Sequence, residues 1–110
     1  MLIAMNRFPV LIGQEEAFEK VWSGRNSYLK EVPGFVTFHL LRGSSDEQTT
    51  PFASHTVWQS RADFEAWTKS ESFRMAHANA GGTRGLYAGP PRLELFEAVE
   101  AVTPLKADPV

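Results

Sequence analysis

The chain has 110 residues and a mass of 12.3 kDa, a length that predicts a single domain. Hydrophobic residues make up 43% and charged residues 22% of the sequence, which is typical of soluble globular proteins and argues against wholesale disorder. The formal net charge of -2 and the pI of about 5.9 give no support to a nucleic-acid-binding role that depends on a basic surface.

Cysteine is absent from the sequence, which excludes disulfides, thiolate zinc sites, iron–sulfur clusters and cysteine nucleophiles. Its absence is consistent with a reducing compartment. No apolar run reaches the ~20 residues needed to span a bilayer, and residues 1–5 lack the charged start and long apolar core of a signal peptide. We therefore expect a cytoplasmic protein without a membrane segment.

The first half of the chain predicts a strand, a helix and a second strand. The first strand is expected at residues 2–10, with apolar residues on both of its alternating faces. After Gly13, the acids Glu15 and Glu16 are well placed to begin a helix, whose apolar stripe follows helical spacing as far as Leu29. Gly24 interrupts this stripe, and Pro33 with the glycine after it turns the chain into a second strand at residues 35–42.

The second half predicts a hairpin, two helices and a last strand. A polar loop at 43–51 joins the second strand to a third at 52–59. Ser60 with Asp63, and Thr68 with Glu71, are capping-box pairs, which predict helices at 61 to about 69 and at about 71–79. The segment 81–91, rich in glycine and proline, is expected to be a loop. A last strand follows at 92–99, and residues 103–110 are expected to fray.

This order of elements is that of a ferredoxin-like α+β fold, with helices on one face of an antiparallel sheet. We predict one domain over residues 1–99 and a C-terminal tail at 100–110. The strands are apolar on both sides, whereas helices can cover only one side. The other side is therefore expected to meet a second copy of the chain, which predicts a homodimer that forms a shared α+β barrel.

The three histidines have no zinc-site spacing, and the sequence lacks a zincin motif, a Gly-x-Ser-x-Gly elbow, a Walker loop and a dinucleotide fingerprint. A Ser-His-Asp triad stays open. His39 and His55 lie in the middle of strands, where a surface or hydrogen-bonded imidazole is the ordinary interpretation. His77 follows Phe73 by four residues on an apolar helix face and precedes a glycine loop. It is either structural or a ligand to a metal or haem.

Asn6 is the polar exception on a strand face that is otherwise apolar. A buried amide without partners costs about 1–3 kcal/mol. The side chain is therefore bonded to a neighbouring backbone, or in water at a barrel rim, or a hydrogen-bond donor inside a pocket. Trp67, like Trp22 and Trp58, is on its own most simply explained by core packing.

Taken together, several segments resemble the haem-degrading monooxygenases of the IsdG type, within the antibiotic biosynthesis monooxygenase (ABM) superfamily of dimeric α+β barrels. The resemblance covers roughly residues 2–99. The Pro-Gly-Phe and Trp-x-Ser elements are features of the whole superfamily, whereas the combination of Asn6, Trp67 and His77 distinguishes the haem-degrading branch from its cofactor-free relatives. The segments are Asn6-Arg7, Val32-Pro33-Gly34-Phe35, Thr56-Val57-Trp58-Gln59-Ser60 with Phe64-Glu65-Ala66-Trp67, and 70–77.

The resemblance implies a role for each of these three residues. His77 would be the axial ligand to the haem iron, Asn6 would donate a hydrogen bond to iron-bound dioxygen, and Trp67 would press on the macrocycle and ruffle it. Haem would be both substrate and cofactor, opened at a meso carbon with release of iron. Because the sequence has no recognisable flavin or nicotinamide motif, electrons would come from an external donor, an unidentified reductase.

Two other functions stay open. A cofactor-independent ABM monooxygenase would bind an aromatic polyketide or a quinol-like substrate directly in the apolar pocket, and His77 would be incidental. A haem-binding carrier or sensor would use the same axial ligand without turnover. The segment 81–91 could form a lid over the haem edge. Four arginines are either partners for haem propionates or solvated surface charges: Arg25, Arg74, Arg84 and Arg92.

Overall fold

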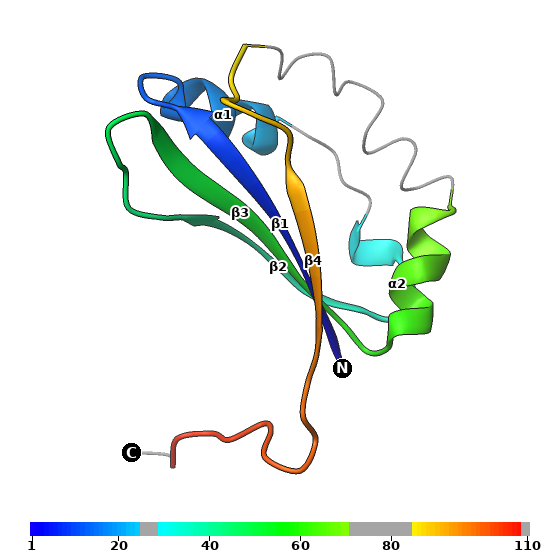
Figure 1. Ribbon diagram of the computed structural model, residues 1–110. Coiled ribbons are helices and arrows are strands. Elements are labelled where there is room, and N and C mark those ends of the chain that lie inside the picture. The colour runs from blue at the N-terminus through cyan, green and yellow to red at the C-terminus, as the bar shows by residue number, and fades with distance from the viewer. Residues whose placement is uncertain (25–28, 71–84, 109–110) are drawn as a thin grey trace.

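The computed structural model describes residues 1–24, 29–70 and 85–108, which form a four-stranded antiparallel sheet with helices on one face (Figure 1). The strand order is β2-β3-β1-β4, so the first strand lies in the interior of the sheet. This arrangement confirms the predicted ferredoxin-like α+β fold. The elements are β1 (Leu2–Leu11), α1 (Glu15–Ser23), the short 3-10 helix η1 (Leu29–Glu31), β2 (Phe35–Arg42), β3 (Thr49–Trp58), α2 (Arg61–Thr68) and β4 (Arg92–Glu97).

The element bounds differ from the sequence-based ones where tertiary pairing decides them. Helix α1 ends at Ser23, because Gly24 caps it, and Leu29 belongs to η1. Strand β3 begins at Thr49, three residues earlier than predicted, because its ladder with β1 continues to the pair Leu11–Thr49. The predicted helix at 71–79 lies outside the described residues. None of the described helices is long and apolar enough to cross a membrane.

The connection between β3 and α2 confirms the predicted cap. The Ser60 hydroxyl accepts a hydrogen bond from the Asp63 backbone N–H at 3.1 Å. Gly34, in the turn before β2, has a φ of +83°, and a side chain there would collide with Asp63. The Gly34 carbonyl also accepts a hydrogen bond from the Gln59 backbone N–H at 2.8 Å. The start of α2 is thus fixed against the start of β2.

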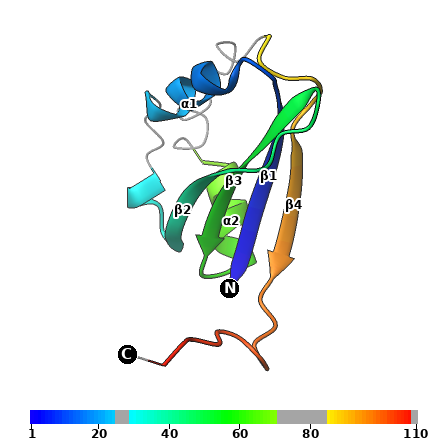
Figure 2. The ribbon, with the colours of Figure 1, turned by 90° about the vertical axis from the view of Figure 1, so that its left-hand side faces the viewer.

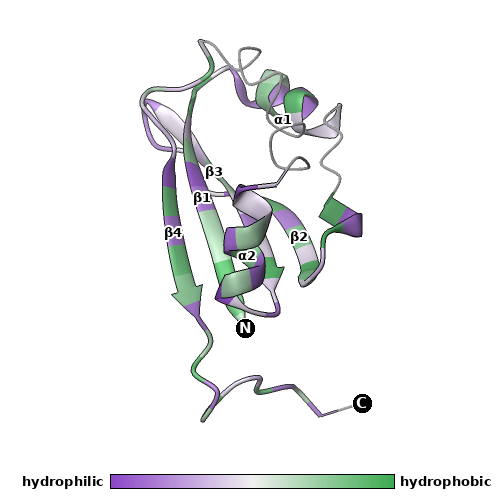
Figure 3. Cartoon of the chain, turned by 90° about the vertical axis from the view of Figure 1, so that its right-hand side faces the viewer, coloured by the Kyte–Doolittle hydropathy of each residue, from purple (hydrophilic) through white to green (hydrophobic). Residues whose placement is uncertain are grey.

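Two separate clusters of buried side chains lie between the sheet and its helices. Helix α2 covers the end of the sheet where β1 begins, and α1 covers the other end (Figure 3). The buried members of the α2 cluster are Leu2, Ala4, Leu29, Trp58 and Phe64. Those of the α1 cluster are Phe8, Val10, Phe18, Phe52 and Leu86. The C-terminal tail leaves β4 and extends beyond the sheet (Figure 2), and its residues 99–108 are exposed.

A network of hydrogen bonds attaches the start of α1 to β3. The Glu15 carboxylate accepts hydrogen bonds from the Gly13 backbone N–H at 2.8 Å and from the Thr50 hydroxyl at 2.8 Å. The Thr50 side chain is fully buried, and its hydroxyl also lies 2.6 Å from the Ser45 hydroxyl. The hydrogen bond from Thr50 is the main reason that the pKa of Glu15 lies below its ordinary value of 4.5.

This network predicts an acid-dependent loss of stability. Because the Glu15 pKa is lowered in the folded chain, its contribution is present above about pH 4.5 and is lost as the pH falls through the folded pKa. Glu15→Gln should therefore lower the Tm by a few degrees at pH 7, and the deficit should shrink below about pH 4. The matched control is Glu47→Gln, at an exposed glutamate. A deficit that stays constant from pH 7 to pH 3 in thermal melts would contradict this role.

Candidate functional site

A row of directly paired residues, with the polar side chains of Asn6 and Ser54 in its middle, lies on the helix-covered face between the two buried clusters; we call it the polar row. Asn6 in β1 pairs with Ser54 in β3 and with Leu93 in β4. Along β1 on this face, the preceding residue is Ala4, in the α2 cluster, and the next is Phe8, in the α1 cluster. An amide and a hydroxyl therefore occupy the sheet surface at the place where the hydrophobic core is interrupted.

The Asn6 amide is half-buried, and its side chain makes no hydrogen bond to any of the described residues. Bonding to a neighbouring backbone, one of the two structural explanations, is therefore not seen. An amide carries two N–H donors and a carbonyl acceptor, all of which are free for water or for a ligand. A half-buried amide without a partner among the described residues can bond to water or to a ligand that brings a polar group to this point.

Two aromatic side chains stack beside the row, one from each of its sides: Trp22 packs against the α1 cluster and Phe38 against the α2 cluster. The rings of Trp22 in α1 and Phe38 in β2 stack with centroids 5.6 Å apart and an angle of 25° between their planes. These two rings and Leu40 line an open hollow of about 560 Å³ between α1 and β2, together with polar and charged side chains of α1: Glu16, Glu19, Lys20 and Ser23. Leu40 pairs with Ser54, so the hollow lies at the β2 end of the polar row. Its size is in the range of small-molecule sites.

Trp67 flanks the row on the side of α2. It is half-buried and packs against the cluster that contains Ala4. Its ring lies 5.3 Å from that of Trp58, at an angle of 33°. Trp58 is itself fully buried, and its indole N–H donates to the Thr56 hydroxyl at 3.0 Å. The orientation of Trp67 is thus set by a neighbour that cannot easily move, which suits a residue that must press on a ligand.

Two of the three candidate residues, Asn6 in β1 and Trp67 in α2, lie on the helix-covered side of the sheet, and no contact between their side chains is seen. His77 and three of the candidate arginines, Arg25, Arg74 and Arg84, lie outside the described residues. The fourth, Arg92, pairs with Arg7 on the face of the sheet that no helix covers. Arg92 therefore does not lie on the face that carries Asn6, and it is not a propionate partner at this site within the same subunit.

Sequence reasoning missed Ser54, Trp22 and Phe38 as site residues. Ser54 shares a strand face with Phe52 and Thr56, so a second polar side chain on an apolar face was visible in the sequence. Its place beside Asn6 depends on the register of β1 and β3, which the alternation of residues does not specify. Trp22 and Phe38 were visible only as members of apolar stripes.

The arrangement fits a flat, largely apolar ligand. The stacked rings of Trp22 and Phe38 lie at the β2 end of the polar row, Trp67 packs with the α2 cluster, and Asn6 lies on the same face of the sheet. Such side chains can supply ring packing and a directional hydrogen bond. The molecule is thus a small ferredoxin-like protein with aromatic and polar side chains on the helical face of its sheet.

Comparison with known proteins identifies the family. The family model for antibiotic biosynthesis monooxygenase (ABM) matches residues 1–79, and the chain belongs to this family. It is 29% identical over 83 residues to the haem oxygenase (staphylobilin-producing) of Staphylococcus haemolyticus. The matched stretch covers 76% of this chain and 79% of that protein. Further matches, to haem-degrading monooxygenases of Shouchella clausii and Bacillus thuringiensis, span 42% and 50% of those proteins.

Two solved structures show the range of the family. A variant of MhuD, the haem degrader of Mycobacterium tuberculosis, holds two manganese protoporphyrin IX molecules per active site. It has a TM-score of 0.72 and 27% identity, with 99% of this chain and 100% of that chain covered. SnoaB of Streptomyces nogalater, a cofactor-independent oxygenase, has a TM-score of 0.64 and 27% identity, with 88% and 91% covered. Similar chains therefore include both haem-degrading and cofactor-independent enzymes.

Because the Asn6 amide makes no hydrogen bond to any of the described residues, we predict that Asn6 does not stabilise the fold. Asn6→Leu should leave the free energy of unfolding within about 1 kcal/mol of the wild type, or raise it, because no protein hydrogen bond is lost. The matched control is Thr56→Val, which removes the acceptor of the buried Trp58 N–H and should cost about 1–3 kcal/mol. Urea denaturation of both variants measures the difference. A larger loss in Asn6→Leu than in Thr56→Val would assign Asn6 a structural role.

Proposed function

We propose that this chain is a haem-degrading monooxygenase that opens the porphyrin at a meso carbon and releases its iron. The observation that carries the proposal is the half-buried Asn6 amide, which has no hydrogen-bond partner among the described residues and shares the helix-covered side of the sheet with aromatic side chains, in a chain whose relatives include haem-degrading enzymes. A porphyrin is flat and mostly apolar, and it has a polar centre. Contacts with the aromatic side chains would hold its faces and edges, while the amide would offer a hydrogen bond at that centre.

Each site residue has a distinct physical task in this proposal. Asn6 donates a hydrogen bond and, as a neutral amide, does not titrate, so its donor is present at every physiological pH. Trp67, backed by Trp58, presses on the plane of the substrate and favours a non-planar shape. Trp22 and Phe38, which stack at the β2 end of the polar row, offer aromatic surface to the same substrate.

His77 is the proposed axial ligand, because a neutral imidazole binds both ferric and ferrous iron. When bound, haem supplies the iron that activates dioxygen and also the ring that is oxidised. Electrons come from an external donor, which we take to be a separate reductase. The chain then has to hold the substrate and shape it, and these are the tasks that the aromatic side chains and the amide perform.

A cofactor-independent oxygenase is the second candidate, favoured by the similarity to SnoaB. In that case the aromatic side chains bind a flat aromatic substrate directly, and His77 has no ligand role. The amide of Asn6 would then bond to a phenolic or carbonyl oxygen of that substrate. The two functions share the aromatic side chains and differ in the need for His77.

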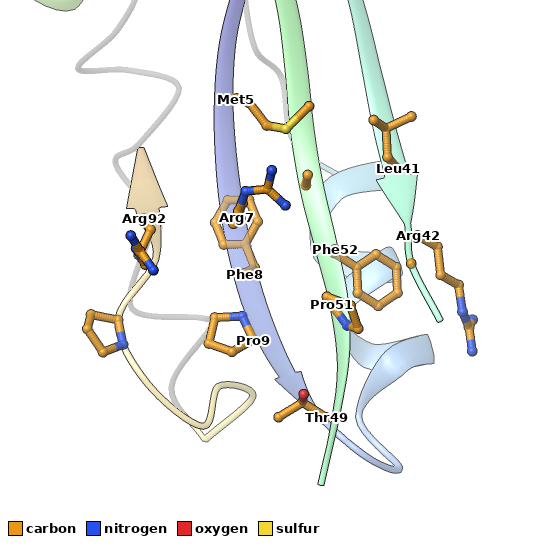
Figure 4. A pocket seen from close by; sticks show the side chains of 13 residues that line it. Met5, Arg7, Phe8, Pro9, Leu41, Arg42, Thr49, Pro51, Phe52 and Arg92 are labelled. Carbon is orange, nitrogen blue, oxygen red and sulfur yellow. The ribbon is translucent and has the colours of Figure 1, made fainter. Parts of the chain in front are cut away.

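We also propose that the chain acts as a homodimer, with the uncovered faces of two sheets packed together. That face contains an apolar hollow of about 420 Å³ (Figure 4), lined by Met5, Leu41, Pro51 and Ala53 among others. Leu41 and Phe96 on the same face are 41% and 47% exposed. Large exposed apolar side chains on one open sheet face are typical of a surface that is covered in the working protein.

A haemin titration tests the proposed function. A Soret band should saturate at one haem per chain and should then decay when ascorbate is added in air with catalase present, while a chelator captures iron. A Soret band that survives reduction in air would assign a carrier or sensor, and the absence of any Soret shift would favour the cofactor-independent oxygenase.

Three variants separate the residue roles in the same assay. His77→Ala should abolish tight haem binding. Asn6→Ala should bind haem but slow its breakdown by about a hundredfold, the usual effect of removing one preorganised donor. Trp67→Phe should bind haem in a flatter form and turn it over more slowly. Haem ligation that persists in His77→Ala would contradict the axial assignment, and unaltered turnover in Trp67→Phe would remove the ruffling role.

The proposed dimer has its own test. Leu41→Lys would place a charge on the packed faces, and should weaken association by about a hundredfold. Analytical ultracentrifugation measures the shift from dimer to monomer. Ile12→Lys is the matched control, because Ile12 is 47% exposed but lies in the turn after β1, away from the face. A wild-type chain that sediments as a monomer at micromolar concentration would contradict the proposal.

A further inference from the structure

The four residues of the polar row are accessible, although the centres of the rows on both sides of it are buried. Ser54 and Asn6, in the middle of the row, are half-buried, as is Leu40 at its β2 end. Leu93, at its β4 end, is 57% exposed. In the two flanking rows the central pairs are buried: Ala4 with Thr56, and Phe8 with Phe52. The polar row is therefore a strip of the helix-covered side that a ligand can contact.

Leu93 is exposed at the place where α2 no longer covers β4. At the end of β4, the Glu97 carboxylate accepts a hydrogen bond from the guanidinium of Arg61 in α2 at 2.7 Å. Leu95, two residues earlier on the same face of the strand, is half-buried and packs against the α2 cluster. Leu93, a further two residues earlier, is open. A large apolar side chain is thus left exposed on the side of the sheet that carries the helices.

The neighbour of Leu93 makes its exposure informative. A single exposed leucine is common on protein surfaces and needs no explanation by itself. Leu93, however, pairs directly with Asn6 in β1, so the Cβ atoms of the two residues lie about 4.5–5.5 Å apart. The Asn6 amide has no hydrogen-bond partner among the described residues. An open apolar side chain next to such an amide suits a ligand in which an apolar part adjoins a polar one.

The order of side chains along the polar row describes the ligand that fits it. A leucine lies at each end, and a hydroxyl and an amide lie between them. Neighbouring strands are about 4.8 Å apart, so the row extends roughly 14 Å from Leu40 to Leu93. The stacked rings of Trp22 and Phe38 lie at the Leu40 end. A ligand that contacts the whole row is therefore wide, apolar at both ends and polar at its centre.

We propose that Leu93 is a substrate-contacting residue, which holds one apolar edge of the substrate beside Asn6 and so selects a wide, flat molecule. This inference rests on the proposed haem function and adds to it the direction of the substrate, whose ring lies across the strands from β2 to β4. A narrower aromatic substrate can pack on Trp22 and Phe38 at the β2 end without contact with Leu93. The side chain of Leu93 thus sets the width of the substrate that the chain prefers.

Titration with protoporphyrin IX tests this contact, because the metal-free ring binds without an axial bond from His77. Quenching of tryptophan fluorescence measures the affinity. Leu93→Asn keeps the approximate size of the side chain but removes its apolar surface, and should weaken binding about fivefold, which is equivalent to about 1 kcal/mol. Leu93→Met keeps the apolar surface and should bind within twofold of the wild type.

Leu105→Asn is the matched control. Leu105 is 92% exposed in the C-terminal tail, so the same substitution is made there away from the polar row, and the affinity should stay within twofold of the wild type. The Tm values of all three variants should lie within about two degrees of the wild type, because both leucines are exposed. A loss of affinity in Leu105→Asn equal to that in Leu93→Asn would overturn the inference.

Haemin titration of the same variants separates this inference from the proposed function. Leu93→Asn should lower the haemin affinity by the same factor, because the contact is with the ring and not with the iron. If the wild type binds both porphyrins and Leu93→Asn binds them within twofold of it, the inference is wrong and the proposed function stands. A wild-type chain that binds neither porphyrin would overturn both. Equal losses in Leu93→Asn and Leu93→Met would also contradict the inference, because the loss would then not follow the apolar surface.

Discussion

The register of β1 in the middle of the sheet is the constraint on which the other features depend. Because side chains alternate between faces, a slip of one residue would exchange everything that β1 presents to its two sides. With the observed register, Asn6 faces the helices beside Ser54, and Met5 faces away from them beside His55. The same ladder continues to Thr50, whose hydroxyl bonds to Glu15 and so positions α1. One pairing thus places the candidate site and a helix.

The sequence predicted the fold because its signals there are local. The alternation in residues 2–10, the capping pair of Ser60 and Asp63, and the turn at Gly34 each depend on nearby residues, and the structure confirms them. The site was predicted only in part. Asn6 and Trp67 were found through the family resemblance, whereas Ser54 and Trp22 gain their significance from pairing and packing between distant segments. The role of His77 and the domain limit at residue 99 stay predictions.

The family uses one scaffold for two kinds of oxidation, and the candidate site shows how few residues separate them. Aromatic side chains such as Trp22 and Phe38 can pack on any flat molecule, with or without iron. What distinguishes a haem site from a site for a free aromatic substrate is an axial ligand and a donor at the centre. The fold therefore identifies the family, whereas Asn6 and His77 carry the argument for the substrate.

The interruption of the hydrophobic core at the polar row has a mechanical consequence. Buried side chains under α1 and α2 form two clusters that meet through the stacked rings of Trp22 and Phe38, and a domain with such a core can open locally at one end while the other end stays closed. A rigid, flat molecule bound at the polar row would contact both clusters and hold them together. The empty protein would then fluctuate as two units and the loaded protein as one, so that substrate would complete the cooperative core that the sequence leaves in two parts.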